Sequence, residues 1–214
     1  MKKIISLLLL LNFSIKAQDV RIGNQVWTSK NLDVSTYSNG DDIPEVQDKT
    51  AWQNLETGAW CYYENKAENG TKYGKLYNWF AVNDPRGLAP KGYHIPKDKE
   101  WTILIEYLGG GLKAGTKMKS TSGWLQYFDS FKIIRSGNGT NTYDFSGLPG
   151  GVRDHVGDFG NVEALGFWWS SSVVALGNDR SIAYYRTLSN QKSSIYNYDF
   201  HSKKNGFSVR CLRD

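Results

Sequence analysis

The sequence predicts an α+β domain. Two segments in the first half of the chain carry apolar residues at helical spacing, whereas from Tyr143 onward apolar and polar residues alternate with a period of two. Thirty of the 214 residues are aromatic and 22 are glycine, a composition that disfavours disorder and favours strands and loops around bulky side chains. Helices followed by antiparallel strands are typical of the α+β class.

The first element after the N-terminal region is a predicted β-hairpin over residues 20–27. Two short strand-like runs flank Gly23 and Asn24, and a glycine supplies the positive φ that tight hairpin turns need. Residues 38–58 are polar and rich in turn-forming residues. They predict a loop.

Two helices are expected in the first half. In residues 75–82, Leu76, Trp79 and Phe80 fall at i, i+3 and i+4, although the segment is only about two turns long. The second helix, residues 98–108, has a longer pattern that begins after Pro96 and stops at three consecutive glycines, 109–111. Its predicted inward residues are Trp101, Leu104, Ile105 and Leu108.

Strands are predicted through the second half, at residues 167–169, 182–188, 194–200 and 207–212. In 194–200, Tyr196, Tyr198 and Phe200 alternate with Asn197 and Asp199. The last strand follows an Asn-Gly turn at 205–206 and alternates apolar positions with polar ones. No internal repeat divides the chain.

Residues 1–17 have the features of a secretory signal peptide. Lys2 and Lys3 precede an apolar run at residues 4–11, and a small residue, Ala17, precedes a polar start. The run is about half of the roughly 20 residues that a membrane-spanning helix needs, so no stable membrane span is expected. We expect a secreted or cell-surface protein whose single domain covers residues 18–214.

Removing residues 1–17 takes away three basic side chains and no acidic one, so the net charge falls from +5 to +2. Such a small, interspersed charge gives no electrostatic footprint for nucleic acid. The two cysteines, Cys61 and Cys211, would sit in an oxidising compartment. Two interpretations stay open: a single disulfide bridge between them, or two buried free thiols.

Several segments together resemble the Fibrobacter succinogenes major paralogous domain, in the order in which that family carries them, over roughly residues 19–214. The segments are Tyr-Gly-Lys-Leu-Tyr-Asn-Trp-Phe-Ala-Val at 73–82, Pro-Lys-Gly-Tyr-His-Ile-Pro at 90–96, Gly-Leu-Pro-Gly-Gly-Val-Arg-Asp at 147–154, Gly-Phe-Trp-Trp-Ser-Ser-Ser at 166–172 and Asn-Gly-Phe-Ser-Val-Arg at 205–210. The resemblance implies a C-type-lectin-like or formylglycine-generating-enzyme-like fold, with two helices, an antiparallel sheet and long loops, in a protein outside the cytoplasm. Many members of the family carry Cys where this chain has Ala89, so a disulfide using that position is not expected here.

No catalytic site is evident. A formylglycine-generating type of oxidase, the alternative function, would need a reactive cysteine pair that binds copper, whereas Cys61 lies among aromatic residues and Cys211 inside a predicted strand. The three histidines are scattered, and no nucleophile elbow or His-Glu-x-x-His helix occurs. We expect a non-enzyme.

The loop at residues 153–163 carries oxygen groups of the kind that calcium binds. Its candidate ligands are Asp154, Asp158, Asn161 and Glu163, and the resemblance to C-type-lectin-like folds, which hold calcium in long loops, strengthens this hypothesis. A solvated turn with Asx-type hydrogen bonds is the alternative. Calcium is the one cofactor that the sequence suggests.

Exposed aromatic rings can stack on sugar rings. The predicted platform consists of tyrosines in the strands around residues 181–200 together with one tryptophan: Tyr184, Tyr185, Tyr196, Tyr198 and Trp168. We therefore expect a binding, adhesion or envelope module with a glycan or another surface protein as partner. A structural subunit of a larger surface assembly would instead lack a pocket for a small ligand.

Overall fold

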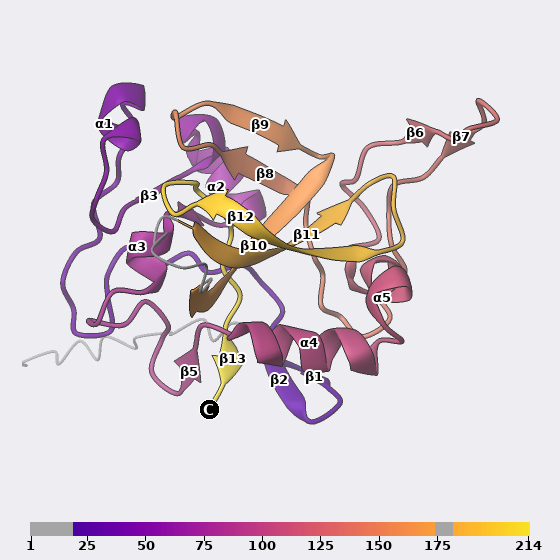
Figure 1. Ribbon diagram of the computed structural model, residues 1–214, viewed down its shortest axis with the longest axis horizontal. Helices are drawn as coiled ribbons and strands as arrows, with labels where there is room; N and C mark the ends of the chain where they lie inside the picture. Colours follow the sequence, from indigo (N-terminus) through magenta and orange to yellow (C-terminus); the bar gives the residue numbers. More distant parts are fainter. Residues whose placement is uncertain (1–18, 174–181) are drawn as a thin grey trace, which may run out of the picture.

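The structure, a computed structural model, describes residues 19–173 and 182–214. Its largest sheet has five strands in the order β12-β11-β10-β8-β9, and a second sheet has four in the order β1-β2-β13-β5 (Figure 1). The strands of the large sheet are β8 (Gly150–Arg153), β9 (Phe159–Val162), β10 (Leu165–Val173), β11 (Ile182–Ser189) and β12 (Ile195–Ser202). The α+β class is confirmed, and one strand pair, β8 with β10, is parallel rather than antiparallel.

The predicted N-terminal hairpin is confirmed as β1 (Asp19–Ile22) and β2 (Gln25–Thr28), with Gly23 at a φ of 61° in the turn. Strand β13 (Leu212–Arg213) lies between β2 and β5 (Tyr93–His94), so residues from both ends of the described chain share one sheet. Two further sheets are small. They pair β3 (Trp60–Cys61) with β4 (Leu76–Tyr77), and β6 (Tyr127–Phe128) with β7 (Ile134–Arg135).

Five α-helices occur in the described residues, where two were expected: α1 (Lys49–Gln53), α2 (Ala67–Tyr73), α3 (Trp79–Val82), α4 (Asp98–Tyr107) and α5 (Gly111–Met118). The predicted helix 98–108 is confirmed as α4. Trp101, Leu104 and Leu108 are buried and Ile105 is half-buried, whereas Lys99 and Glu106 are exposed. The carboxylate of Glu100 accepts a hydrogen bond of 2.8 Å from the backbone N–H of Lys97, which closes the start of the helix.

The helix predicted over residues 75–82 is wrong in its first half. Leu76 and Tyr77 form β4, and only α3 is helical. The side chain of Asn78 explains the late start, because its oxygen accepts hydrogen bonds of 3.0 Å from Ala81 N–H and from Ala59 N–H. The loop predicted at 38–58 likewise contains a short helix, α1, which Asp48 caps through Ala51 N–H at 2.7 Å.

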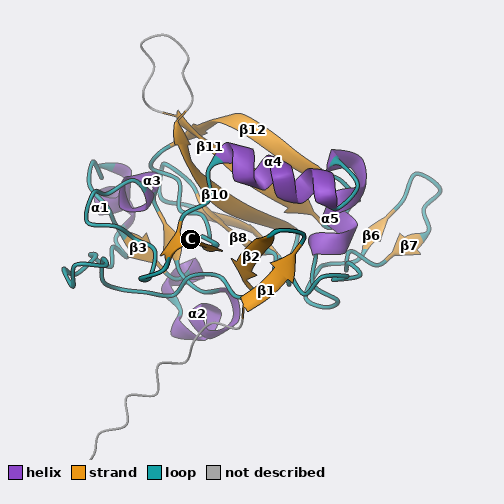
Figure 2. Cartoon of the chain, turned by 90° about the horizontal axis from the view of Figure 1, so that it is seen from below, coloured by secondary structure: helices purple, strands orange, loops and turns teal. Residues whose placement is uncertain are grey.

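Helices α4 and α5 lie against one face of the β10–β12 strands, as Figure 2 shows. Because side chains alternate along a strand, this face carries Trp168 and Leu188, which are buried in a core cluster with Trp101 and Leu104. The other face carries Phe167 and Tyr185, which belong to a second cluster together with Phe207.

The segment predicted as a strand at 207–212 is mostly a series of single bridges. Gly206, Phe207 and Ser208 bridge Arg153, Tyr77 and Trp168 in turn. The expected alternation of buried and exposed residues is wrong here, because Arg210 is buried as well. Its guanidinium donates to Asn31 Oδ1 and to the carbonyl oxygens of Thr28, Phe145 and Ser146 at 2.7 to 2.9 Å, which satisfies the charge inside the fold.

Candidate ligand-binding groove

A groove of about 730 Å³ opens beside the large sheet on the face away from α4. Its volume is in the range that small organic ligands fill. The walls come from the β8–β9 hairpin, from β10 to β12 and from the turn at 205–207. The lining residues are Val152, Asp154, His155, Asn161, Leu165, Phe167, Tyr185, Thr187, Ser189, Lys192, Tyr196, Asn205 and Phe207.

The floor of the groove is aromatic and fixed. The rings of Phe167 and Phe207 stack with their centroids 4.9 Å apart and an angle of 11° between the planes, and the ring of Tyr185 lies 5.1 Å from that of Phe207. All three side chains are buried. Since each ring restrains the others, the floor offers a preformed apolar surface.

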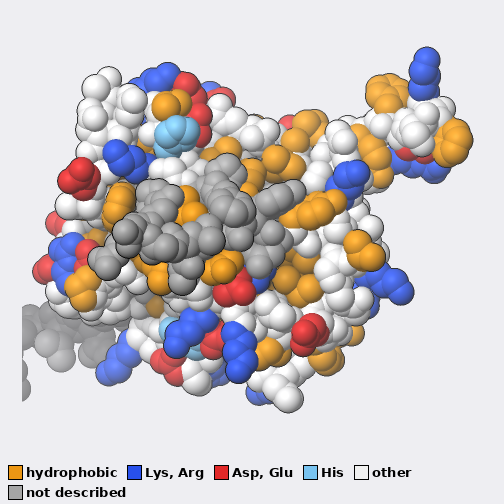
Figure 3. Space-filling view, viewed as in Figure 1, with side chains coloured by type: hydrophobic (Ala, Val, Ile, Leu, Met, Phe, Trp, Pro, Cys, Tyr) orange, Lys and Arg blue, Asp and Glu red, His pale blue; other side chains and the backbone are white. Residues whose placement is uncertain are grey.

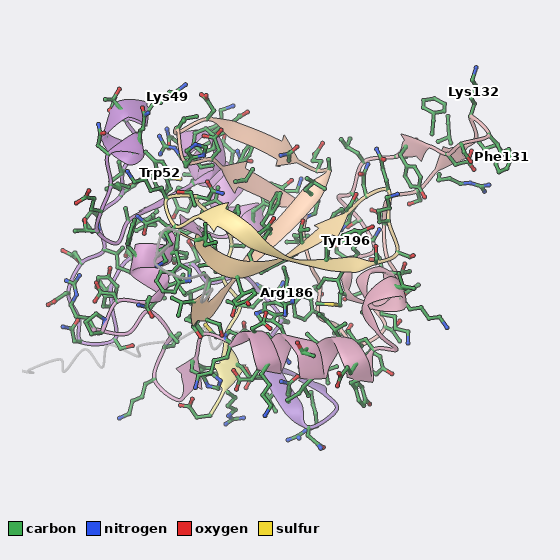
Figure 4. The ribbon with its side chains drawn as sticks, in the orientation of Figure 1. Lys49, Trp52, Phe131, Lys132, Arg186 and Tyr196 are labelled. Atoms are coloured by element: carbon green, nitrogen blue, oxygen red, sulfur yellow. The ribbon has the colours of Figure 1, made fainter. Side chains whose placement is uncertain are left out.

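Tyr196 is the aromatic residue of the groove that keeps part of its surface open. It is half-buried, and the β11–β12 register pairs it with Thr187. Residues directly opposite each other in an antiparallel pair share a face, so Tyr196 lies on the same face as Thr187 and Tyr185. Figure 4 marks its place on β12.

Two buried oxygens of the groove lack a hydrogen-bond partner in the part of the chain that the structure describes. Thr187 is 6% exposed and Asn205 is 3% exposed, and neither Thr187 Oγ1 nor Asn205 Oδ1 has a partner in the described structure. Leaving such a group unpaired costs about 1–3 kcal/mol. Because both residues line the same groove, a bound molecule with hydroxyl groups would recover that loss.

The rim at the β8–β9 end is a rigid turn. The carboxylate of Asp154 accepts hydrogen bonds of 3.0 and 2.8 Å from the backbone N–H groups of Val156 and Asp158. Behind the turn, the buried guanidinium of Arg153 donates to the carbonyl oxygen of Gly157 and lies 4.5 Å from the ring of Trp52. The conformation of the loop at this end of the groove is therefore fixed by hydrogen bonds and packing within the protein.

Two of the four residues predicted to bind calcium lie beside lysine side chains instead. Asp158 forms an ion pair of 2.6 Å with Lys49, and Glu163 lies 3.6 Å from Lys72. Within residues 19–173 and 182–214, no group of three or more His, Cys, Asp or Glu side chains is placed to hold a metal ion. Asp154 and Asn161 both line the groove. The geometry matches the alternative, a turn with Asx-type hydrogen bonds.

The predicted aromatic platform is split between the two faces of the sheet. Trp168 is buried and does not line the groove, so the prediction that it presents a stacking surface is wrong, whereas Tyr185 is buried in the floor of the groove. Trp168 lies on the helix face, where its Nε1–H donates to Asn31 Oδ1 at 2.9 Å. Tyr184 alternates with Tyr185 and therefore also faces away from the groove. Tyr196 lines the groove, and the side chain of Tyr198 lies outside the described residues.

The disulfide that the sequence suggested is not formed. Cys61 and Cys211 are both buried free thiols, and they belong to different core clusters. Burial raises the pKa of each thiol to about 12, although Arg153 and Arg210 respectively act in the opposite direction. Both groups are therefore neutral packing residues near neutral pH.

Sequence reasoning missed nine of the thirteen lining residues of the groove, among them Phe167, Thr187, Asn205 and Phe207. Thr187 had a usable signal, because it lies two positions after Tyr185 in a strand of period two. Asn205 had none, since it reaches the groove through the bridges that join its turn to Arg153 and Tyr77.

The chain matches the family profile of the Fibrobacter succinogenes major domain over residues 20–213. No curated protein and no solved structure matches the chain. In the described part of the chain, no helix has the length and apolar character needed to cross a membrane.

Proposed function

The chain belongs to the Fibrobacter succinogenes major domain family, and from its groove we propose that it is a secreted or cell-surface module that binds carbohydrate without catalysis. The observation that carries the proposal is the pair of buried oxygens, on Thr187 and Asn205, that have no partner among the described residues and lie beside an aromatic floor. No charged side chain belongs to that floor, which suits a neutral ligand.

A pyranose ring matches what the groove offers. One side of such a ring presents C–H groups that stack on an aromatic residue, and its edge carries hydroxyl groups that both donate and accept hydrogen bonds. Tyr196 supplies the partly open ring, Thr187 Oγ1 can donate or accept, and Asn205 Oδ1 accepts. Asp154 and Asn161 add polar groups at the rim.

The location outside the cytoplasm is part of the same proposal and rests on the signal-peptide pattern of residues 1–17, which lie outside the described residues. We also propose that the fold is of the C-type-lectin-like class. Support comes from the pairing of the N-terminal hairpin with β13, and from the antiparallel strands β10 to β12 that follow the helices.

The absence of catalysis is supported by the thiols. The alternative, an oxidase of the formylglycine-generating type, needs two neighbouring reactive cysteines. Cys61 and Cys211 are instead buried in separate clusters, each with a raised pKa. A purely structural subunit would leave unexplained why two buried oxygens border a groove of this size.

A glycan array probed with the mature chain, residues 18–214, with and without calcium, tests the proposal, and titration calorimetry then gives the affinity for a glycan that binds. Thr187→Val keeps the shape of the side chain and removes its hydroxyl. We expect the affinity to fall about tenfold, the equivalent of one good hydrogen bond, while the stability stays the same or rises slightly because an unpaired buried group is gone.

Thr28→Val is the matched control. Thr28 is also 6% exposed, but its Oγ1 accepts a hydrogen bond of 3.1 Å from Cys211 N–H. Its variant should lose about 1–2 kcal/mol of stability and keep its affinity. Equal affinity of Thr187→Val and the unaltered protein, or no glycan bound at all, would refute the proposal.

A further inference from the structure

A second feature lies far from the groove: an arm, residues 125–135, that carries β6 and β7 and projects from the body of the molecule (Figure 1). Its apolar side chains point outward. Phe128 is 70% exposed and Phe131 at the tip is 81% exposed, and Leu125, Ile133 and Ile134 are also exposed. Soluble proteins seldom leave this many large apolar groups together in water without a use for them.

The turn of the arm is satisfied by its own hydrogen bonds. Asp129 Oδ1 accepts from the backbone N–H groups of Phe131 and Ile133, both at 2.9 Å. Asp129 Oδ2 accepts from Arg135 Nε at 2.8 Å, so the only carboxylate of the arm is paired. Because these backbone groups have partners within the arm, moving the tip out of water costs less than it would for an open loop.

Apolar side chains occupy both faces of the arm and not one. Phe128 and Ile134 are directly paired and share a face. Tyr127 and Ile133, their neighbours along the chain, belong to the opposite face because side chains alternate along a strand. A flat protein surface would cover one face only. A surrounding apolar medium would cover both faces and the tip together.

The charge of the arm favours an anionic medium. Lys132 and Arg135 outweigh Asp129, which gives the arm a net charge of +1. The neighbouring helix α5 lies at the same end of the molecule (Figures 1 and 2) and adds an exposed lysine, Lys113, next to the exposed Leu112. In Figure 3, hydrophobic and basic side chains gather on this end.

We propose that the arm anchors the protein to an anionic lipid surface, with Phe131 and Ile134 in the boundary between headgroups and acyl chains and Lys132 at the level of the phosphates. Aromatic and aliphatic side chains beside a lysine are the composition of interfacial anchors, and the lysine stem can stay in the apolar layer while its ammonium reaches the phosphates. This inference does not depend on the groove.

Flotation of the mature chain, residues 18–214, with vesicles tests the proposal. Vesicles of equal parts phosphatidylglycerol and phosphatidylcholine should carry the protein upward, and vesicles of phosphatidylcholine alone should carry much less. The double variant Phe131→Ser and Ile134→Ser should bind the anionic vesicles more than about tenfold more weakly. Lys132→Glu should bind them at least about fivefold more weakly, since it removes one favourable charge and adds an unfavourable one.

Ile103→Ser is the matched control, because Ile103 is an exposed apolar residue of α4 outside the arm; its variant should float like the unaltered protein. All variants should keep the same melting temperature, since these side chains are exposed. The proposal is overturned if the protein does not float with anionic vesicles, or if the double variant floats equally well. It is also overturned if the arm mutations abolish only a dimer in solution and leave flotation unchanged.

Discussion

The two faces of β10 and β11 carry alternate residues of the same strands and have different surroundings. On one face, Trp168 and Leu188 are fully buried against the side covered by α4 and α5 (Figure 2). On the other face, their chain neighbours Phe167 and Thr187 border the groove, because a hairpin and a turn cover only part of that side.

Trp168 and Thr187, one from each face, differ in their polar atoms more than in their burial. Trp168 and Thr187 are both buried. The indole N–H of Trp168 has Asn31 as its partner, whereas the hydroxyl of Thr187 has none in the described structure. Burial alone shows only that a side chain is packed. An unpaired polar atom beside a cavity also shows where a ligand could form a hydrogen bond.

The largest effect is expected on the helix face. Trp168→Ala should lower the free energy of unfolding by ~3–5 kcal/mol, because it opens a cavity in the core and removes a hydrogen bond to Asn31. Urea unfolding followed by fluorescence and circular dichroism measures this. A loss below ~1 kcal/mol would mean that the helix face is not the packed side of the sheet.

A smaller effect is expected for Asp98→Asn at the start of α4. Asp98 lies 2.7 Å from the guanidinium of Arg186, which is fully buried and is paired with Trp168 in the strand register. Because Asp98 is partly exposed, solvent screens the pair, and we expect a loss of ~1–2 kcal/mol rather than the larger cost of a fully buried pair. The control is Glu64→Gln, whose ion pair with Lys66 is about half exposed on both sides. It should leave the unfolding midpoint almost unchanged. An equal effect of both variants would show that the partly buried ion pair is worth no more than the exposed one.

The smallest effect on stability is expected in the groove. Tyr196→Ala should cost about 1 kcal/mol in unfolding free energy because the ring is only half-buried. The same change should weaken glycan binding by ~1–2 kcal/mol. Calorimetric titration and thermal melting of one protein sample separate the two quantities. If stability falls as far as in Trp168→Ala, Tyr196 belongs to the core and the two faces are alike.

Periodicity predicted the elements in which burial follows from the spacing of apolar residues alone. Helix α4, the N-terminal hairpin and strands β10 to β12 were all expected from spacing, and so was the α+β class. Helix α5 was not, because Gly111 and Gly115 suggest a break. Gly115 allows the helix to approach the backbone of Ser194 closely, since a Cβ at that position would lie 2.4 Å from the carbonyl oxygen of Ser194.

The groove could be predicted only in part. Alternation places Thr187 beside the tyrosines of its own strand, but it cannot show which tyrosine is covered by Phe207 from a later segment. Arg210 shows the same limit in the core. A charged residue in an alternating strand predicts exposure, and only the assembled fold brings four hydrogen-bond acceptors around it.

The bridging segment 205–211 and β13 have a consequence for the time course of folding. Thr28 and Cys211, 183 positions apart, exchange hydrogen bonds, and the same segment bridges Tyr77, Arg153 and Trp168. Contacts between residues so distant in sequence form slowly, because a long loop must close before they contribute any stability. A chain that is still emerging from the ribosome and lacks this segment and β13 cannot complete the four-stranded sheet, and its five-stranded sheet lacks the bridges to Gly206 and Ser208. We therefore expect the native packing of both sheets to be reached only when synthesis is nearly finished.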